Sequence, residues 1–209
     1  MNTNKLRFVE NGPCADVTER KRSLRTYMRA RRADNENRDV KEQLLCDNLL
    51  NVLEGFESEK AGAGTRRTVF IYLSFSSEAP TDKPIARLIE KGFSVLCPRI
   101  EKGEMFAVAY GEDFSISSMG IREPVGDIRE KTPDYIVLPL LAADKAGNRL
   151  GYGKGYYDEY LAKHSAAKRI GYCFDFQILR EVPHNEKDEK LDVIVTDKQV
   201  TITSAGNIR

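Results

Sequence analysis

The sequence has few of the residues that would indicate a metal centre, a disulfide framework or a membrane segment. Its two histidines, His164 and His184, leave little material for a histidine-rich metal centre or a serine–histidine triad, and no G-x-S-x-G motif is present. The four cysteines have no short C-x-x-C spacing, so neither a disulfide framework nor a zinc site is indicated. No apolar run approaches the roughly 20 residues of a membrane span, and residues 1–14 lack the apolar core of a signal peptide. We therefore expect a cytoplasmic protein with no membrane partner.

Net charge is also nearly absent, because 33 lysines and arginines oppose 32 aspartates and glutamates. Bulk attraction to nucleic acid is therefore not implied, and we expect no nucleic-acid partner. One basic run departs from this balance, since residues 20–32 contain seven basic residues and no acid. A solvated helix face is its default interpretation, and contact with RNA or DNA is the alternative. Lys21 and Arg25 lie four residues apart, so on a helix they would share one face and could clamp a polyphosphate. The basic residues of the run are Arg20, Lys21, Arg22, Arg25, Arg29, Arg31 and Arg32.

The N-terminal quarter of the chain is predicted to be helical after a short tail. Residues 1–15 show no periodic pattern and are predicted to form a mobile tail, whereas residues 16–209 are predicted to form one domain. Apolar residues at helical spacing predict one helix over residues 17–33, with Thr18 as its N-cap. A second apolar stripe predicts a helix over residues 40–55 that ends at Gly55.

From residue 68 onward, short apolar strands alternate with helices. This alternation predicts an α/β fold, a single three-layer domain in which helices flank a largely parallel central sheet and the N-terminal helices pack against it. The predicted strands cover residues 68–75, 93–98, 105–110, 134–142, 169–174 and 192–197. The predicted helices cover residues 81–92, capped by Thr81, and 156–164.

The segment "NRLGYGKGYYD", residues 148–158, lies between a predicted strand and a predicted helix. Ligands of parallel α/β sheets bind in such loops, at the carboxyl ends of the strands. The three glycines let the backbone approach an anion, the following helix directs its positive end toward it, and Arg149 and Lys154 add full charges. The spelling matches neither common phosphate-loop motif. On spacing alone, a phosphate site and an ordinary glycine-rich turn both remain open.

Three carboxylates are further candidates for the site. Glu78 follows the first predicted strand, where it could accept hydrogen bonds from an amidine-like edge of a heterocyclic ring or cap the next helix. Asp158 and Asp188 offer hard oxygen ligands of the kind that Mg²⁺ prefers beside nucleotide phosphates. A surface position is the alternative for both aspartates.

Taken in order, these pieces resemble the 5-formyltetrahydrofolate cyclo-ligase family, also called methenyltetrahydrofolate synthetases, over roughly residues 18–197. The most specific part is "DKAGNRLGYGKGYYD", which matches the family pattern D-x-x-G-x-R-L-G-x-G-x-G-Y-Y-D. Shorter matches follow the same order along the chain: "KRSLR", "IYLSFSSEAPT", "CPRI", "GIREP", "IGYCFDFQIL", "VPHNEKDEKLD" and "VIVTD".

The resemblance implies an ATP- and Mg²⁺-dependent conversion of 5-formyltetrahydrofolate to 5,10-methenyltetrahydrofolate, with release of ADP and phosphate. In the implied mechanism the formyl oxygen is phosphorylated, N10 attacks the activated carbon, and phosphate leaves. The protein has to align the γ-phosphate and neutralise the charge on its oxygens. A catalytically inactive folate-binding regulator and an RNA-binding accessory protein using the basic helix are the alternatives.

The resemblance also implies individual roles. Lys154 and Arg149 are the implied catalytic residues, and Asp158 and Asp188 the implied Mg²⁺ ligands. The implied ATP-binding residues are Lys21, Arg25, Arg149, Leu150, Gly151, Tyr152, Gly153, Lys154, Gly155, Tyr156 and Tyr157. The implied folate-binding residues are Leu73, Glu78, Gly153, Lys154, Gly155, Tyr156 and Tyr157. Tyr152 stands where relatives commonly have arginine.

The substrates implied by the family are ATP and 5-formyltetrahydrofolate, with or without a polyglutamate tail. Arg99 and Arg122 are the candidates to meet that acidic tail. The family resemblance also favours a monomer.

Overall fold

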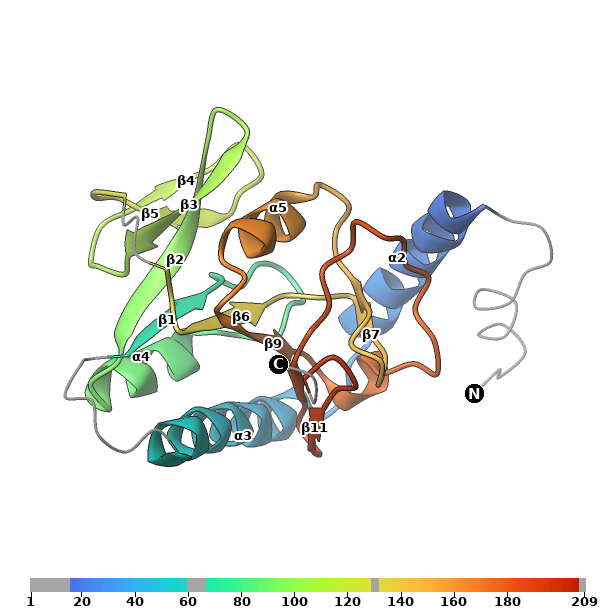
Figure 1. Cartoon of the computed structure of the whole chain (residues 1–209), viewed down its shortest axis with the longest axis horizontal. Coiled ribbons are helices and arrows are strands. Elements are labelled where there is room, and N and C mark those ends of the chain that lie inside the picture. Colours follow the sequence, from blue (N-terminus) through green and yellow to red (C-terminus); the bar gives the residue numbers. More distant parts are fainter. Residues whose placement is uncertain (1–15, 60–66, 129–131, 207–209) are drawn as a thin grey trace.

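A computed structural model describes residues 16–59, 67–128 and 132–206 and shows a mostly parallel central sheet between helices (Figure 1). The predicted tail, residues 1–15, lies outside the described residues. The seven strands follow the order β11-β10-β9-β6-β1-β2-β3, and only the edge strands β11 and β3 pair antiparallel to their neighbours. The strands are β1 (Thr68–Ile71), β2 (Ser94–Glu101), β3 (Glu104–Ala109), β6 (Tyr135–Leu138), β9 (Lys168–Tyr172), β10 (Val193–Val195) and β11 (Val200–Ile202).

Helices cover both faces of this sheet, as the alternating pattern predicts. Because successive side chains of a strand point to opposite faces, Val69 and Ile71 pack with one core cluster and Phe70 with another. The first cluster includes residues of α3 (Arg38–Glu59) and α4 (Asp82–Glu90). The second includes residues of α5 (Tyr156–Lys163), where the Tyr160 ring stacks on Phe70 with centroids 4.4 Å apart. The three-layer α/β fold is thereby confirmed.

Two small hairpins complete the described fold, together with a short 3-10 helix. The sequence reasoning did not predict these hairpins, because their strands are too short to show a period. They are β4 (Phe114–Ile116) with β5 (Arg122–Pro124), and β7 (Ala142–Ala143) with β8 (Arg149–Leu150), and the 3-10 helix is η1 (Asp175–Gln177).

Several predicted strands are longer than the observed ones. The strand predicted over residues 68–75 ends at Ile71, and the one predicted over 134–142 ends at Leu138. Beyond β1, Tyr72 and Leu73 are buried without being part of the strand. A run of apolar residues indicates that a segment is buried but not whether it is a strand. The predicted strands therefore included buried loop residues at the carboxyl edge of the sheet.

The predicted ends of two helices are also wrong. α3 continues past Gly55 to Glu59, because Phe56 stacks on Tyr135 and Glu57 accepts a hydrogen bond from the Tyr135 hydroxyl. These contacts with Tyr135 stabilise the last turn of α3, so the helix continues beyond Gly55. α2 (Val17–Ala33) has Asp16 rather than Thr18 at its N-cap position.

The basic helix α2 packs over the loops at the carboxyl edge of the sheet, whereas α3 packs against the sheet face (Figure 1). Leu24 and Met28 of α2 are fully buried in a cluster that includes Leu150 of β8 and Val182. The basic run is therefore not a wholly solvated face, because its helix lies beside the glycine segment that follows β8.

The turn between β7 and β8 depends on a glycine, which gives a stability prediction. Gly147 has φ +88°, and a Cβ there would lie 2.6 Å from the carbonyl oxygen of Leu191. We expect Gly147→Ala to lower the free energy of unfolding by about 3 kcal/mol. Gly92→Ala is the matched control, since Gly92 also has φ +88° but nothing lies within 4 Å of its added Cβ. The control should cost only about 1 kcal/mol. Urea unfolding measures the free energy of unfolding of both variants. Equal losses of stability would show that backbone strain, and not the clash with Leu191, accounts for the cost of Gly147→Ala.

Candidate active site

A single cavity at the carboxyl edge of the sheet is lined by most of the residues that the sequence singled out. It opens between the loop after β1, strands β2 and β3, the turn of the β4–β5 hairpin and the glycine segment. The predicted site residues that line it are Leu73, Glu78, Arg149, Gly151, Tyr152, Gly153, Lys154, Gly155, Tyr156, Tyr157 and Asp158.

The glycine segment has the backbone shape that its spacing suggested. Gly153 and Gly155 have φ values of +96° and +80°, a region that favours glycine. Gly155 is the N-cap of α5, so the helix begins at Tyr156 as predicted. A Cβ on Gly153 would lie 3.0 Å from the Arg25 guanidinium carbon. The glycine therefore lets a cation of α2 lie directly against the loop.

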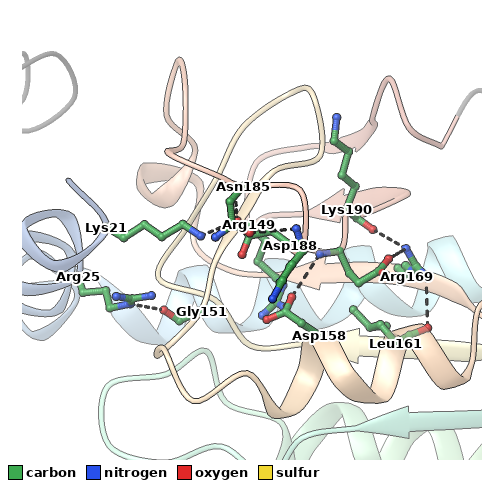
Figure 2. A network of polar contacts seen from close by, with 12 residues as sticks. Lys21, Arg25, Arg149, Gly151, Asp158, Leu161, Arg169, Asn185, Asp188 and Lys190 are labelled. Carbon is green, nitrogen blue, oxygen red and sulfur yellow. Dashed lines mark hydrogen bonds and ion pairs between the residues drawn. The ribbon is translucent and has the colours of Figure 1, made fainter. Parts of the chain in front are cut away.

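Arg25 also fixes this loop by hydrogen bonding, because its Nε donates to the carbonyl oxygen of Gly151 at 3.0 Å (Figure 2). Burial lowers the pKa of Arg25, the neighbouring Arg29 lowers it further, and Asp188 acts in the opposite direction. A cation held in this way adds positive charge to the backbone of the glycine segment, as an anion site requires.

Two cations line the cavity itself, and their surroundings differ. The Arg149 side chain is only 4% exposed, and its Nη2 donates to Asp158 Oδ1 at 2.7 Å. Its guanidinium also lies 5.9 Å from the centroid of the Tyr157 ring. Lys154 is exposed, and its ammonium group forms no hydrogen bond or ion pair with another residue in the described part of the chain. Arg149 is therefore preorganised, whereas Lys154 remains available to a ligand.

The two predicted metal carboxylates belong to one polar network (Figure 2). Asp188 Oδ2 pairs with the Lys21 ammonium group and accepts a hydrogen bond from the Asn185 backbone N–H at 2.6 Å. Asp158 Oδ1 accepts from Arg149 and from the backbone N–H of Glu189 at 3.3 Å. The neighbouring positions 188 and 189 thus bring the two carboxylates to the same end of the site.

These two carboxylates fit one mode of magnesium binding and not another. No group of three or more histidine, cysteine, aspartate or glutamate residues suited to a metal exists within residues 16–59, 67–128 and 132–206, so no all-protein cage is formed there. Two carboxylates beside the glycine segment match instead the kind of Mg²⁺ site in which one or two carboxylates and the phosphate oxygens of a nucleotide are the ligands.

Glu78 lies in the cavity as a hydrogen-bond acceptor with an ordered environment. Its carboxylate accepts from the Phe75 backbone N–H at 2.8 Å and from the Tyr152 hydroxyl. Burial raises the pKa of Glu78, and the hydrogen bonds from Tyr152 and Phe75 and the charge of Arg32 oppose that rise. The helix-capping alternative is wrong, because Thr81 is the N-cap of α4 and the Glu78 carboxylate bonds the preceding turn.

The apolar wall of the cavity was missed by sequence reasoning. It is formed by Pro98, Ile100, Met105, Met119 and Ile121. Pro98 and Ile100 alternate along β2, a pattern that indicates one shared face. The period was visible in the sequence, but the unpredicted β4–β5 hairpin supplies the opposite side of this wall.

Six predicted positions do not line the cavity: Lys21, Arg25, Asp188, Leu150, Arg99 and Arg122. The Leu150 side chain is buried against α2, because it faces the cluster that contains Leu24. Arg99 alternates with Pro98 and Ile100 and therefore points away, toward Glu101 and the carbonyl oxygen of Gly126. Arg122 pairs with Asp82 of α4. That these two arginines meet an acidic tail outside the cavity stays a prediction.

This fold and site define an α/β enzyme whose cavity is lined by a glycine loop with cations and by aromatic and apolar residues. The family model of the 5-formyltetrahydrofolate cyclo-ligases matches residues 17–197. The chain therefore belongs to the 5-formyltetrahydrofolate cyclo-ligase family.

Individual relatives agree with this assignment. The 5-formyltetrahydrofolate cyclo-ligase of Escherichia coli (strain K12) is 32% identical over 144 residues, which cover 64% of this chain and 79% of the relative. That of Mus musculus is 30% identical over 198 residues, 86% of this chain and 94% of the relative. The NMR structure of Aquifex aeolicus 5,10-methenyltetrahydrofolate synthetase aligns with a TM-score of 0.72 at 26% identity, covering 88% of this chain and 93% of the other.

The family membership makes the chain an ATP-dependent ligase and does not favour the RNA-binding and regulator alternatives. The basic helix supports this conclusion, because Lys21, Arg25 and Arg32 are engaged in contacts within the protein. Among the described residues, no helix combines the length and apolarity needed to cross a bilayer.

Proposed function

We propose that the cavity converts 5-formyltetrahydrofolate and ATP into 5,10-methenyltetrahydrofolate, ADP and phosphate. The observation that carries the proposal is the composition of this one cavity. Arg149, Lys154 and the open glycine backbone line it together with Glu78 and Tyr157. An ATP terminal phosphate bound to the cations and the glycine backbone would meet a flat heterocycle bound to Glu78 and Tyr157 within the same enclosure.

The chemistry needs positioning more than acid–base catalysis. The formyl oxygen attacks the γ-phosphorus, and the bond from phosphorus to the bridging oxygen breaks to release ADP. N10 then attacks the formyl carbon, and the carbon–oxygen bond breaks as phosphate leaves with the former formyl oxygen and the proton released from N10. Arg149 and Lys154 would neutralise the charge on the phosphoryl oxygens, the largest contribution in reactions of this type.

The folate side is assigned by shape and hydrogen bonding. The Glu78 carboxylate can accept two N–H donors from the edge of a pterin ring, and Leu73 and the rings of Tyr156 and Tyr157 can pack against its flat faces. Alignment of the formyl oxygen with the phosphate then follows from holding both ligands at once.

We assign Asp158 and Asp188 to magnesium on the same basis. Bound there with the nucleotide, Mg²⁺ would supply positive charge to the phosphate oxygens. Lys21 and Arg149 now neutralise these carboxylates, so both cations would turn toward phosphate oxygens when the metal is present.

The metal assignment predicts a changed magnesium requirement. Asp188→Asn and Asp158→Asn should each raise the Mg²⁺ concentration for half-maximal activity about tenfold, since loss of one carboxylate weakens the site. The measurement is a Mg²⁺ titration at fixed ATP, combined with Mn²⁺ binding followed by electron paramagnetic resonance. Asp47→Asn is the control, because Asp47 pairs with Arg87 on the surface of α3 and α4. An unaltered metal requirement in both site variants would refute the assignment.

The overall function is tested by the absorbance of the methenyl product. Protein, ATP, Mg²⁺ and 5-formyltetrahydrofolate should give this chromophore together with an equimolar amount of phosphate, and omission of ATP should abolish both. An inactive regulator would bind folate without a nucleotide-dependent signal.

Three coarser expectations belong to the same proposal. We propose that residues 16–209 act as one domain, that the protein is a monomer, and that it works in the cytoplasm. Light scattering coupled to size-exclusion chromatography measures the oligomeric state.

A further inference from the structure

Arg32, near the end of α2, is a buried cation outside the lining of the cavity. It is only 4% exposed, although it belongs to a basic run in which Arg22 and Arg29 are exposed. A charged group is costly to remove from water unless hydrogen bonds satisfy it. The Arg32 guanidinium must therefore have hydrogen-bond acceptors placed around it.

That environment joins three segments that form the site. Arg32 Nε donates to Ser77 Oγ at 3.1 Å in the loop after β1. Its Nη1 donates to the Tyr152 hydroxyl at 2.6 Å in the glycine segment and to the Leu140 carbonyl oxygen at 3.4 Å after β6. One side chain thus ties the loop that carries Glu78 to the loop that carries Lys154.

The Tyr152 hydroxyl connects Arg32 to Glu78. It accepts a hydrogen bond from Arg32 and donates one to the Glu78 carboxylate. Burial raises the pKa of Tyr152, and the nearby Glu78 raises it further, so the hydroxyl keeps the proton that it donates. The direction of both hydrogen bonds is therefore fixed, because the guanidinium can only donate and the carboxylate can only accept.

We propose that Arg32 is a positioning residue for the folate side of the site, which through the Tyr152 hydroxyl holds the Glu78 carboxylate in place. This inference rests on the proposed function, in which Glu78 accepts hydrogen bonds from the substrate ring. Arg32 touches neither substrate and acts only through Tyr152 and Ser77.

The groups around Glu78 set the expected pH dependence. Tyr72 after β1 and Tyr157 of α5 are electrostatically coupled to Glu78, and Arg38 of α3 reaches its carbonyl oxygen rather than its carboxylate. Arg32 is the one cation of the described residues whose charge lowers the pKa of Glu78. Removing Arg32 should raise the pKa of Glu78. On acidification, the Glu78 carboxylate should then become protonated at a higher pH than in the unchanged protein.

The first test is Arg32→Leu, with Arg22→Leu as the matched control on an exposed position of the same helix. In Arg32→Leu the KM for 5-formyltetrahydrofolate should rise about tenfold with kcat changed less than threefold. The acid limb of kcat/KM should move to higher pH, and Arg32→Lys should restore part of both effects. Arg22→Leu should leave KM and the pH profile unchanged. An unshifted pH profile in Arg32→Leu would overturn the proposal.

A second variant keeps the test valid if Arg32→Leu folds poorly. Tyr152→Phe removes only the hydroxyl and leaves Arg32 bonded to Ser77 and Leu140. It should raise the folate KM by a similar factor. The double variant with Arg32→Leu and Tyr152→Phe should have a KM no higher than that of the more impaired single variant, because both substitutions disrupt the same hydrogen-bonded connection to Glu78. Multiplicative effects of the two substitutions on KM would show independent roles and overturn the inference.

Glu78→Gln separates this inference from the function on which it rests. A raised folate KM in Glu78→Gln, with normal KM values in Arg32→Leu and Tyr152→Phe, would overturn the role of Arg32 and leave the folate site intact. An unchanged KM in Glu78→Gln would overturn both.

Discussion

Replacing Lys154 by alanine is expected to lower kcat by about 10²–10³-fold, the usual cost of removing one group that stabilises developing charge. The ammonium group lines the cavity and is exposed, and it forms no hydrogen bond or ion pair with the other described residues. Its loss should therefore leave the protein as stable as before, with a thermal midpoint within about 2 °C of the unchanged protein. Steady-state formation of the methenyl chromophore and thermal unfolding measure the two quantities.

Lys163→Ala is the control for this substitution. Lys163 is an exposed lysine at the end of α5 whose ammonium group pairs with Glu104, outside the cavity. It should keep nearly normal turnover. If Lys154→Ala had nearly normal turnover and an unchanged melting curve, the proposal that the glycine segment binds the ATP phosphates would be contradicted.

Glu78→Gln is expected to raise the KM for 5-formyltetrahydrofolate about 10–100-fold, because an acceptor oxygen that faces ligand N–H groups becomes a donor. The sign of the pH dependence follows from burial, which raises the pKa of Glu78. As the pH falls through this raised pKa, the carboxylate is protonated and the KM of the unchanged protein should increase. The glutamine variant cannot titrate there, so its KM should be high and flat over the same range.

Glu36→Gln provides the control, since Glu36 is exposed and is not part of the cavity lining. Its KM and pH profile should match those of the unchanged protein. If the KM of the Glu78→Gln variant still rose steeply on acidification, another group would be responsible for the acid limb.

The layers of the fold and the glycine segment could be predicted because they depend on local pattern. Alternating strands and helices gave the three-layer arrangement, and Gly155 marked the start of α5. The ends of β1 and β6 could not be predicted, because buried loops such as residues 72–73 continue the apolar run after the strand stops. Hydrophobicity reports removal from water and not the hydrogen-bonding pattern of the backbone.

The site was only partly predictable for a different reason. Arg32 looks like the other arginines of its run, and it differs only through partners at positions 77, 140 and 152. Those partners are distant in the sequence, so spacing within the helix carries no information about them. The wall formed by Met119 and Ile121 depends on a hairpin whose strands contain three residues each. Strands this short show no period to read.

The ion pair between Lys21 and Asp188 joins residues that lie 167 positions apart. During translation, α2 leaves the ribosome long before its partner carboxylate has been made. Until then, Leu24 and Met28 lack Leu150 and Val182, the neighbours that cover them in the finished protein. A nascent or truncated chain therefore presents an apolar, positively charged helix of the type that chaperones bind. Substrates can protect only the completed polypeptide from proteolysis, because only that polypeptide contains both ends of the site.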